Sequence, residues 1–200
     1  MDIQQINQHL ARAEDLKQAG NYLAAIRTCE EILLENLNCS LAYEEIGDNY
    51  LSLHQLKKAE KALLQAKKFN LNSPNTAYLL GFLYSCQEDW QRSLVELERA
   101  NKLKPNHPEV LRCLGWTLYQ LGKQGQGIIL LKRAHALAPN DPFTLTDLGM
   151  CYLNQENFYQ AQEALEEALR LDPRNKIVKD CLQNLFRVLE AAKRKTRSKK

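Results

Sequence analysis

The residues able to do acid–base, nucleophilic or metal chemistry are scattered along this 200-residue sequence. None of the four histidines stands in a His-x-x-x-His or His-Glu-x-x-His pattern, which would place two zinc ligands on one face of a helix. The glycine-rich segment 122–127 lacks the Lys-Ser or Lys-Thr that completes a phosphate-binding loop. Paired acids such as Glu30-Glu31 are typical of solvated helix faces. The sequence therefore favours a non-catalytic protein with no cofactor and no metal site.

The cysteines and the N-terminal residues bear on the cellular compartment. No two of the six cysteines form a Cys-x-x-Cys pair, and a chain of this length with 44% hydrophobic residues can bury a core without disulfides. The first residues show no basic segment followed by an apolar stretch, and no run of 18 apolar residues occurs. We therefore expect reduced thiols and a cytoplasmic location, with no signal peptide and no membrane span.

Charge is distributed unevenly along the sequence. The 27 basic residues outnumber the 24 acidic ones, but six of the basic residues lie within residues 193–200. The 21 basic residues that remain are fewer than the acids, so residues 1–192 are mildly acidic. This distribution excludes a protein that coats nucleic acid with its whole surface. Weak contact with nucleic acid or an anionic membrane through Lys193–Lys200 stays an alternative.

The elements that would position these residues repeat with a period of 34. Four glycines share this spacing, and each follows an Ile or Leu and precedes an alanine by nineteen residues: Gly47, Gly81, Gly115 and Gly149. All six prolines fall at the ends of the units, where they can begin or end a helix without breaking one. Apolar residues recur at helical spacing within each unit, on both sides of a short polar or glycine-containing turn. Each unit is therefore predicted to form two helices.

The last unit carries the fullest pattern, through Leu148-Gly149, Tyr152, Ala161, Ala168 and Pro173. In these residues the chain resembles the tetratricopeptide repeat (TPR) family. The resemblance implies an all-α fold, a right-handed superhelix of five helix-turn-helix repeats at 6–39, 40–73, 74–107, 108–141 and 142–175. It also implies that the amphipathic segment 176–192 is a C-terminal capping helix. Residues 1–192 would then form the repeat domain, and 193–200 a flexible basic tail.

The resemblance further implies which residues line the concave groove, because positions 2, 5, 9 and 12 of each unit's first helix point there in this family. The N-terminal half of this face is predicted to be acidic, through Glu14, Glu44, Glu45 and Asp48. The centre and the C-terminal half are predicted to bind a peptide through aromatic and apolar residues and one cation: Tyr78, Phe82, Arg112, Trp116, Tyr119 and Met150. Aromatic residues and Arg dominate the binding energy of many interfaces. The same aromatics could instead fill space between neighbouring helices, and the sequence leaves this open.

These patterns predict a protein–protein interaction scaffold that binds an apolar or amphipathic segment of another protein, as a peptide or a helix, in the concave groove. The basic residues with which co-chaperones of this family hold acidic C-termini are absent, and acids stand at matching positions. One alternative is a type III secretion translocator chaperone, which this chain resembles in its repeats. The other is polyanion contact through the basic tail. The oligomeric state is left open, with a monomer as one option.

Overall fold

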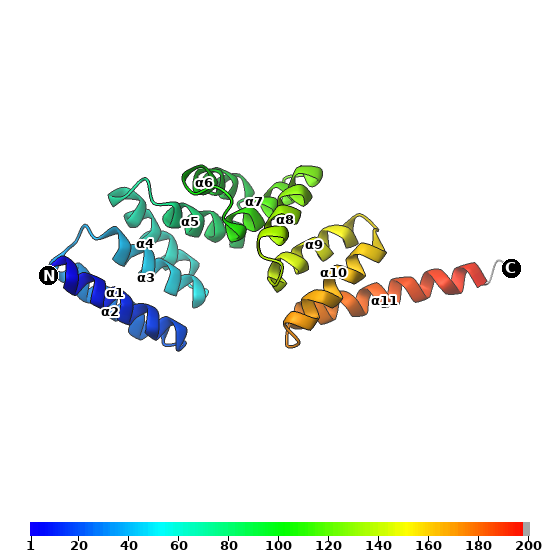
Figure 1. Ribbon diagram of the computed structural model, residues 1–200, viewed down its shortest axis with the longest axis horizontal. Helices are drawn as coiled ribbons and strands as arrows, with labels where there is room; N and C mark the ends of the chain where they lie inside the picture. Colours follow the sequence, from blue (N-terminus) through cyan, green and yellow to red (C-terminus); the bar gives the residue numbers. More distant parts are fainter. Residues whose placement is uncertain (198–200) are drawn as a thin grey trace. The chain divides into compact units, whose positions relative to one another are not determined.

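The computed structural model describes the backbone of residues 1–197 and the side chains of residues 1–190. The chain divides into two compact units, Met1–Pro105 and Asn106–Lys200, where the sequence predicts one repeat domain. The described residues form eleven helices and no strand, so the predicted all-α fold class is confirmed (Figure 1). Within residues 1–197, no helix combines the length and the apolar character that crossing a bilayer requires.

Unit 1 consists of three pairs of helices, each pair joined by a short turn and packed together. The pairs are α1 (Ile3–Gln18) with α2 (Tyr22–Glu35), α3 (Ser40–Ser52) with α4 (Leu56–Phe69), and α5 (Pro74–Cys86) with α6 (Trp90–Leu103). Each first helix also contacts the first helix of the next pair, so α3 lies between α1 and α5. Side chains that project between these first helices can therefore join residues about one repeat apart in the sequence.

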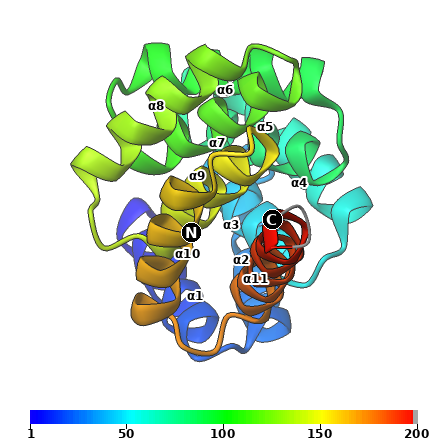
Figure 2. The ribbon, with the colours of Figure 1, turned by 90° about the vertical axis from the view of Figure 1, so that its right-hand side faces the viewer.

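Unit 2 has two such pairs and a terminal helix. The elements are α7 (Pro108–Gln120) with α8 (Gln124–Leu137), α9 (Pro142–Asn154) with α10 (Phe158–Leu171), and α11 (Lys176–Arg197). Helix α11 packs against α10 and α9 (Figure 1 and Figure 2). Its Val178, Leu182 and Leu185 join the buried core of this unit. It extends through Arg197, whereas the sequence places the end of the capping helix at residue 192 and a flexible segment after it. Residues 198–200 of the predicted tail lie outside the described residues.

One turn conformation recurs inside every pair. Its left-handed residue has φ between 54° and 81° and falls at the same position of each repeat: Gly20, His54, Glu88, Gly122 and Glu156. The next N–H donates to the carbonyl five residues earlier, with N···O distances of 2.8–3.0 Å, as in the Schellman motif that ends many helices. Glycine adopts this conformation without strain, but three of the five turns form it with a side chain present. The turn therefore follows from the repeat as a whole.

Close contact between paired helices depends on the glycines that revealed the period. A Cβ at Gly47, Gly81 or Gly149 would stand 2.5–2.6 Å from the Cγ of a leucine on the partner helix. In the fourth repeat the obstacle is the backbone itself, since a Cβ at Gly115 would lie 2.8 Å from the carbonyl oxygen of Gly127. No room for a larger side chain exists at these positions, so the glycines fix how near the two helices lie.

Candidate functional site

The predicted peptide-binding residues lie on the first helices of the repeats, and each unit carries its own set. On unit 1, Tyr78 and Phe82 are one turn apart on α5, and their rings stack with centroids 6.4 Å apart. Both side chains are partly buried because they pack against a core that includes Leu51, Leu79 and Leu83. The remainder of each ring is accessible on the surface of unit 1.

On unit 2, Arg112 of α7 is held by an ion pair with α9. Its Nη1 lies 3.0 Å from Oδ2 of Asp147, and the two side chains are 18% and 16% exposed. The guanidinium carbon also stands 5.7 Å from the ring centroid of Phe143, which is 60% exposed. Burial raises the pKa of Asp147 to about 6, although the positive charge of Arg112 acts to lower it. The structure thus sets the direction of Arg112 beside an exposed aromatic ring.

Tyr119 requires a correction. It is 5% exposed, and its hydroxyl donates a hydrogen bond of 3.1 Å to the carbonyl oxygen of Cys151. Its ring stacks on Trp116, with centroids 6.2 Å apart. Tyr119 therefore packs in the core between α7 and α9, where its side chain presents almost no surface to a ligand. The alternative that aromatics fill space between neighbouring helices holds at this position.

The other two predicted residues of unit 2 stay partly accessible. Trp116 packs against the core of the unit but is only partly buried, and Met150 on α9 has intermediate exposure. They occupy the same position in successive repeats, 34 residues apart. Unit 2 therefore keeps Arg112, Trp116 and Met150 as candidate contacts, and Phe143 joins them. Phe143 stands at position 2 of the fifth repeat, one of the positions that point into the groove in the family, but it is not among the predicted binding residues.

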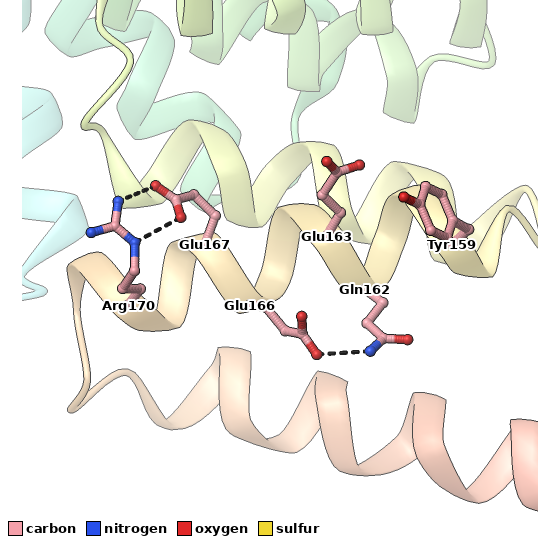
Figure 3. A pocket seen from close by; sticks show the side chains of 6 residues that line it. All are labelled: Tyr159, Gln162, Glu163, Glu166, Glu167 and Arg170. Carbon is pink, nitrogen blue, oxygen red and sulfur yellow. Dashed lines mark hydrogen bonds and ion pairs between the residues drawn. The ribbon is translucent and has the colours of Figure 1, made fainter.

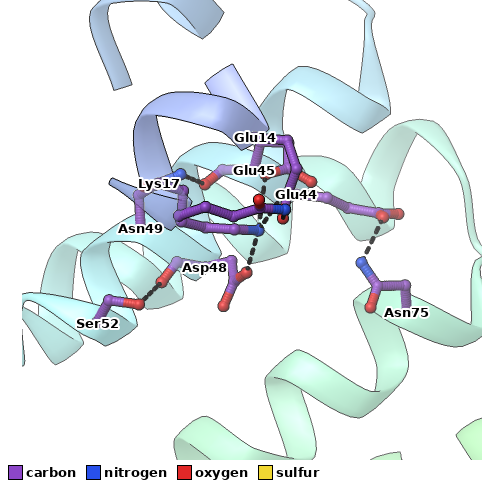
Figure 4. Close-up of polar contacts among 9 residues, drawn as sticks. Glu14, Lys17, Glu44, Glu45, Asp48, Asn49, Ser52 and Asn75 are labelled. Carbon is purple, nitrogen blue, oxygen red and sulfur yellow. Dashed lines mark hydrogen bonds and ion pairs between the residues drawn. The ribbon is translucent and has the colours of Figure 1, made fainter. Parts of the chain in front are cut away.

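The acidic face predicted on unit 1 has a cation at its centre. Nζ of Lys17 lies 2.5 Å from Oε2 of Glu14, 3.3 Å from Oε2 of Glu45 and 3.0 Å from Oδ2 of Asp48 (Figure 4). Burial lowers the pKa of the Lys17 ammonium, but the carboxylates of Glu14 and Asp48 outweigh it and raise that pKa above its usual value. Burial raises the pKa of Glu45, while the hydrogen bond from Lys17 lowers that of Glu14. The three acids are thus bound to Lys17 rather than arranged for a cationic ligand.

Glu44 also differs from its predicted place on the acidic face, because its side chain is buried, with 3% exposure. Its carboxylate accepts a hydrogen bond of 3.0 Å from Nδ2 of Asn75 (Figure 4). It accepts another from the hydroxyl of Thr76. Both donors come from α5, so Glu44 fastens α3 to α5. This position contributes to stability within unit 1 and leaves no charge on the surface.

The residues that sequence reasoning missed are the partners of those it selected, namely Asp147 for Arg112, Lys17 for Asp48 and Asn75 for Glu44. Asp147 lies 35 residues after Arg112, Asp48 lies 31 after Lys17, and Asn75 lies 31 after Glu44. Each separation is close to one repeat, because neighbouring first helices meet at nearly the same register. A search for donors and acceptors separated by about 34 residues would have found these pairs from the sequence.

Other chemistry-bearing groups lie apart from these faces. Burial raises the pKa of the Cys29 and Cys151 thiols to about 12, so both stay protonated at neutral pH. Among the described side chains, no group of three or more His, Cys, Asp or Glu residues is arranged to hold a metal ion. A shallow hollow of about 600 Å³ runs along α10, where Tyr159, Glu163 and Glu166 line an acidic surface (Figure 3).

Comparison with known proteins gives one family match in the sequence. The family model described as tetratricopeptide repeat matches residues 142–175, which form α9, α10 and the segment up to α11. A sequence search of curated proteins finds no match.

Solved structures extend the likeness to most of the chain. A chain of the APC/C hetero-tetramer Cut9–Hcn1 is 19% identical, with a TM-score of 0.82 over 88% of this chain and 35% of that chain. TTC0263, a thermophilic TPR protein of Thermus thermophilus, is 19% identical, with a TM-score of 0.73 over 90% of this chain and 98% of that one. YrrB, described as a TPR protein with an unusual peptide-binding site, is 20% identical, with a TM-score of 0.64 over 88% and 90%. At these identities the likenesses establish the fold.

Proposed function

We propose that this chain, which has the fold of tetratricopeptide-repeat proteins and matches their family model in its last repeat, is a non-catalytic scaffold that binds an apolar or amphipathic segment of another protein. The fold supports a role in protein–protein interaction, and proteins of this family are generally scaffolds without catalytic activity. The proposed contacts lie on the first-helix faces of the repeats, in the predicted concave groove.

The exposed ring of Phe143 beside Arg112 is the observation that carries this proposal. A side chain that is 60% exposed and apolar gains stabilisation when a partner covers it. Arg112 lies next to it with its guanidinium already oriented by Asp147, so little side-chain entropy is lost when it binds a backbone carbonyl or a carboxylate. An apolar segment with an acceptor group near its anchor fits this pair.

Partly buried aromatic and sulfur side chains provide the remaining contacts. On unit 1, the stacked rings of Tyr78 and Phe82 form one apolar surface. On unit 2, Trp116 and Met150 occupy equivalent positions of successive repeats. Large rings with few rotamers give contact area at low entropic cost, and Met adapts to irregular partners. The peptide-binding site named for YrrB supports this use of the fold in a similar protein.

Alanine variants of the anchors test the proposal. Partners are captured with the full chain from cells of its source and identified, and the dissociation constant of each is then measured with the purified pair. Phe82→Ala reports on unit 1, and Trp116→Ala and Phe143→Ala report on unit 2. Each variant that removes a dominant anchor should weaken binding by about 2 kcal/mol, roughly thirtyfold. Gln126→Ala, an exposed change on α8, the second helix of the same repeat, is the control and should leave the affinity nearly unchanged.

The result that contradicts the proposal is undiminished binding by all three variants after circular dichroism shows that they remain helical. A partner that is lost only when residues 193–200 are deleted, and that binds more weakly as salt rises, would favour polyanion contact through the basic tail instead.

A further inference from the structure

An apolar hollow lies on unit 1, away from the predicted anchors, between α2 and α4. It has a volume of about 320 Å³, and we call it the α2–α4 hollow. Its floor consists of side chains from three helices: Leu33, Tyr43, Ile46, Tyr50 and Ala62. Exposed leucines continue the apolar surface along α2 and the turn after it, since Leu34 is 84% exposed and Leu37, in that turn, is 69% exposed. A floor of this composition suits one large apolar or aromatic side chain.

The rim of the α2–α4 hollow is charged on both sides. On α4 it carries Lys58 and Lys61, three residues apart and both exposed, and on α2 it carries Glu30. Nζ of Lys58 stands 5.3 Å from the ring centroid of Tyr50. Among the described side chains, no carboxylate lies within ion-pair distance of either lysine. The occupant that fits is therefore an aromatic group accompanied by two acids about one helical turn apart.

The chain itself presents such a group on α10 of unit 2. Tyr159 is 78% exposed, and Glu163 and Glu166 follow it within two turns (Figure 3). The two acids are three residues apart, the same spacing as Lys58 and Lys61, so the two helices can align both charges at once. Glu166 accepts one hydrogen bond of 2.7 Å from the neutral amide of Gln162, whereas the neighbouring Glu167 is paired with the cation of Arg170 at 2.8 Å and 2.5 Å.

We propose that a second copy of this chain docks α10 on the α2–α4 hollow, with its Tyr159 in the hollow. Glu163 and Glu166 then pair with Lys58 and Lys61, and the phenol hydroxyl donates a hydrogen bond to the carboxylate of Glu30. Complementary charge favours this occupant, because Glu163 and Glu166 match the two lysines, whereas two copies of the α10 face would oppose glutamate to glutamate. The two faces differ, so the contact is heterologous, and copies add head to tail into a ring or an open chain.

Sedimentation velocity of the purified full chain tests self-association. The monomer mass is 23.0 kDa. The mean mass of the wild type should exceed this value and rise with concentration, and it should fall when salt is raised from about 0.05 M to about 0.5 M. Tyr159→Ala and the double variant Lys58→Glu, Lys61→Glu should each weaken association at least tenfold, roughly the effect of losing one anchor. Lys57→Glu, an exposed change on α4 outside the hollow, should leave it unchanged.

Charge exchange makes the test specific. The double variants Lys58→Glu, Lys61→Glu and Glu163→Lys, Glu166→Lys should each be monomeric alone, and an equimolar mixture should associate again. A wild type that stays at 23.0 kDa at all concentrations overturns the proposal, as does a mixture that remains monomeric. Association that persists in both double variants overturns it too. Partner binding through Phe82, Trp116 and Phe143 uses other side chains, so either proposal can fail without the other.

Discussion

Units 1 and 2 each hold a cation between neighbouring first helices, but the surroundings of the two cations differ. Glu45 and Asp147 occupy the same position in the second and fifth repeats, and each pairs with a cation of the preceding repeat. Burial raises the pKa of both carboxyl groups. In unit 1, Lys17 is shared by three carboxylates, whereas in unit 2 Asp147 and Arg112 pair beside the ring of Phe143.

This difference shows how one repeat position serves two purposes. Around Lys17 the acids are 24–42% exposed and keep contact with water, so the cluster is a network with several replaceable members. The Arg112–Asp147 pair is less exposed, so water compensates less for the charge that a lost partner leaves behind. Loss of one partner should therefore cost more in unit 2 than in unit 1, and the following variants measure that contrast.

The largest effect is expected for Arg112→Met, which leaves the carboxylate of Asp147 without its cation at 16% exposure. At pH 8 the free energy of unfolding should fall by about 2–3 kcal/mol, because a poorly solvated charge loses its partner. At pH 5 the loss should be smaller, since Asp147 is then largely protonated in the wild type as well. Urea unfolding at both pH values measures this, and equal losses would contradict it.

The pH dependence of the wild type should carry a smaller contribution from the same group. The pKa of Asp147 is about 6 in the folded protein against 3.8 for the unperturbed group, so the folded state binds more protons between these values. Stability should therefore decrease by about 1–2 kcal/mol as pH rises from about 4 to about 6, and level off above. Subtracting the curve of Asp147→Asn isolates this group. Curves that run parallel through the window would show that Asp147 titrates normally.

Lys17→Met should cost less than Arg112→Met although it removes three ion pairs. The carboxylates left behind retain water contact, so we expect a loss of about 1 kcal/mol at pH 7. High salt should reduce the loss further by screening the repulsion among Glu14, Glu45 and Asp48. Thermal unfolding at low and high salt gives the comparison. A loss of stability as large as that of Arg112→Met would show that the surroundings of Lys17 and Arg112 do not differ in this respect.

The smallest effect is expected for Asp48→Asn, which removes one carboxylate of three from Lys17. In the wild type, Nζ of Lys17 lies 3.0 Å from Oδ2 of Asp48. The amide oxygen of the variant can still accept a hydrogen bond from this ammonium group. Stability should change by less than about 0.5 kcal/mol. Thermal unfolding of this variant beside Arg112→Met tests whether the network tolerates what the less exposed pair does not. A melting temperature that drops as far as in Arg112→Met would rule out replaceable partners in unit 1.

The elements of the fold could be predicted from the sequence because their signals are local. Pro74, Pro108 and Pro142 are the first residues of α5, α7 and α9, where a missing N–H and a fixed φ suit a helix start. Glycines at a period of 34 mark the close approach of paired helices. The type of side chain on each first-helix face could also be predicted, since helical spacing alone assigns a face.

Whether those side chains are exposed or buried could not be predicted, because their exposure depends on which atoms of successive repeats are in contact. Tyr119 and Phe82 are both aromatic residues of a first helix. The hydroxyl of Tyr119 donates a hydrogen bond to the carbonyl of Cys151 in the core, whereas the ring of Phe82 remains partly exposed. Glu44 is likewise indistinguishable from a surface acid until α5 brings Asn75 against it.

The sequence by itself determined the period, the helix pairs and the polarity of each face, because these follow from residue types at fixed spacing along one chain. Only the tertiary structure decided that Lys17 gathers three acids, that Asp147 orients Arg112 and that Tyr119 is buried. These outcomes depend on separations of a few ångströms between different helices. Such separations are set by packing across repeats, where burial and partner charge change the chemistry of a side chain that the sequence leaves unspecified.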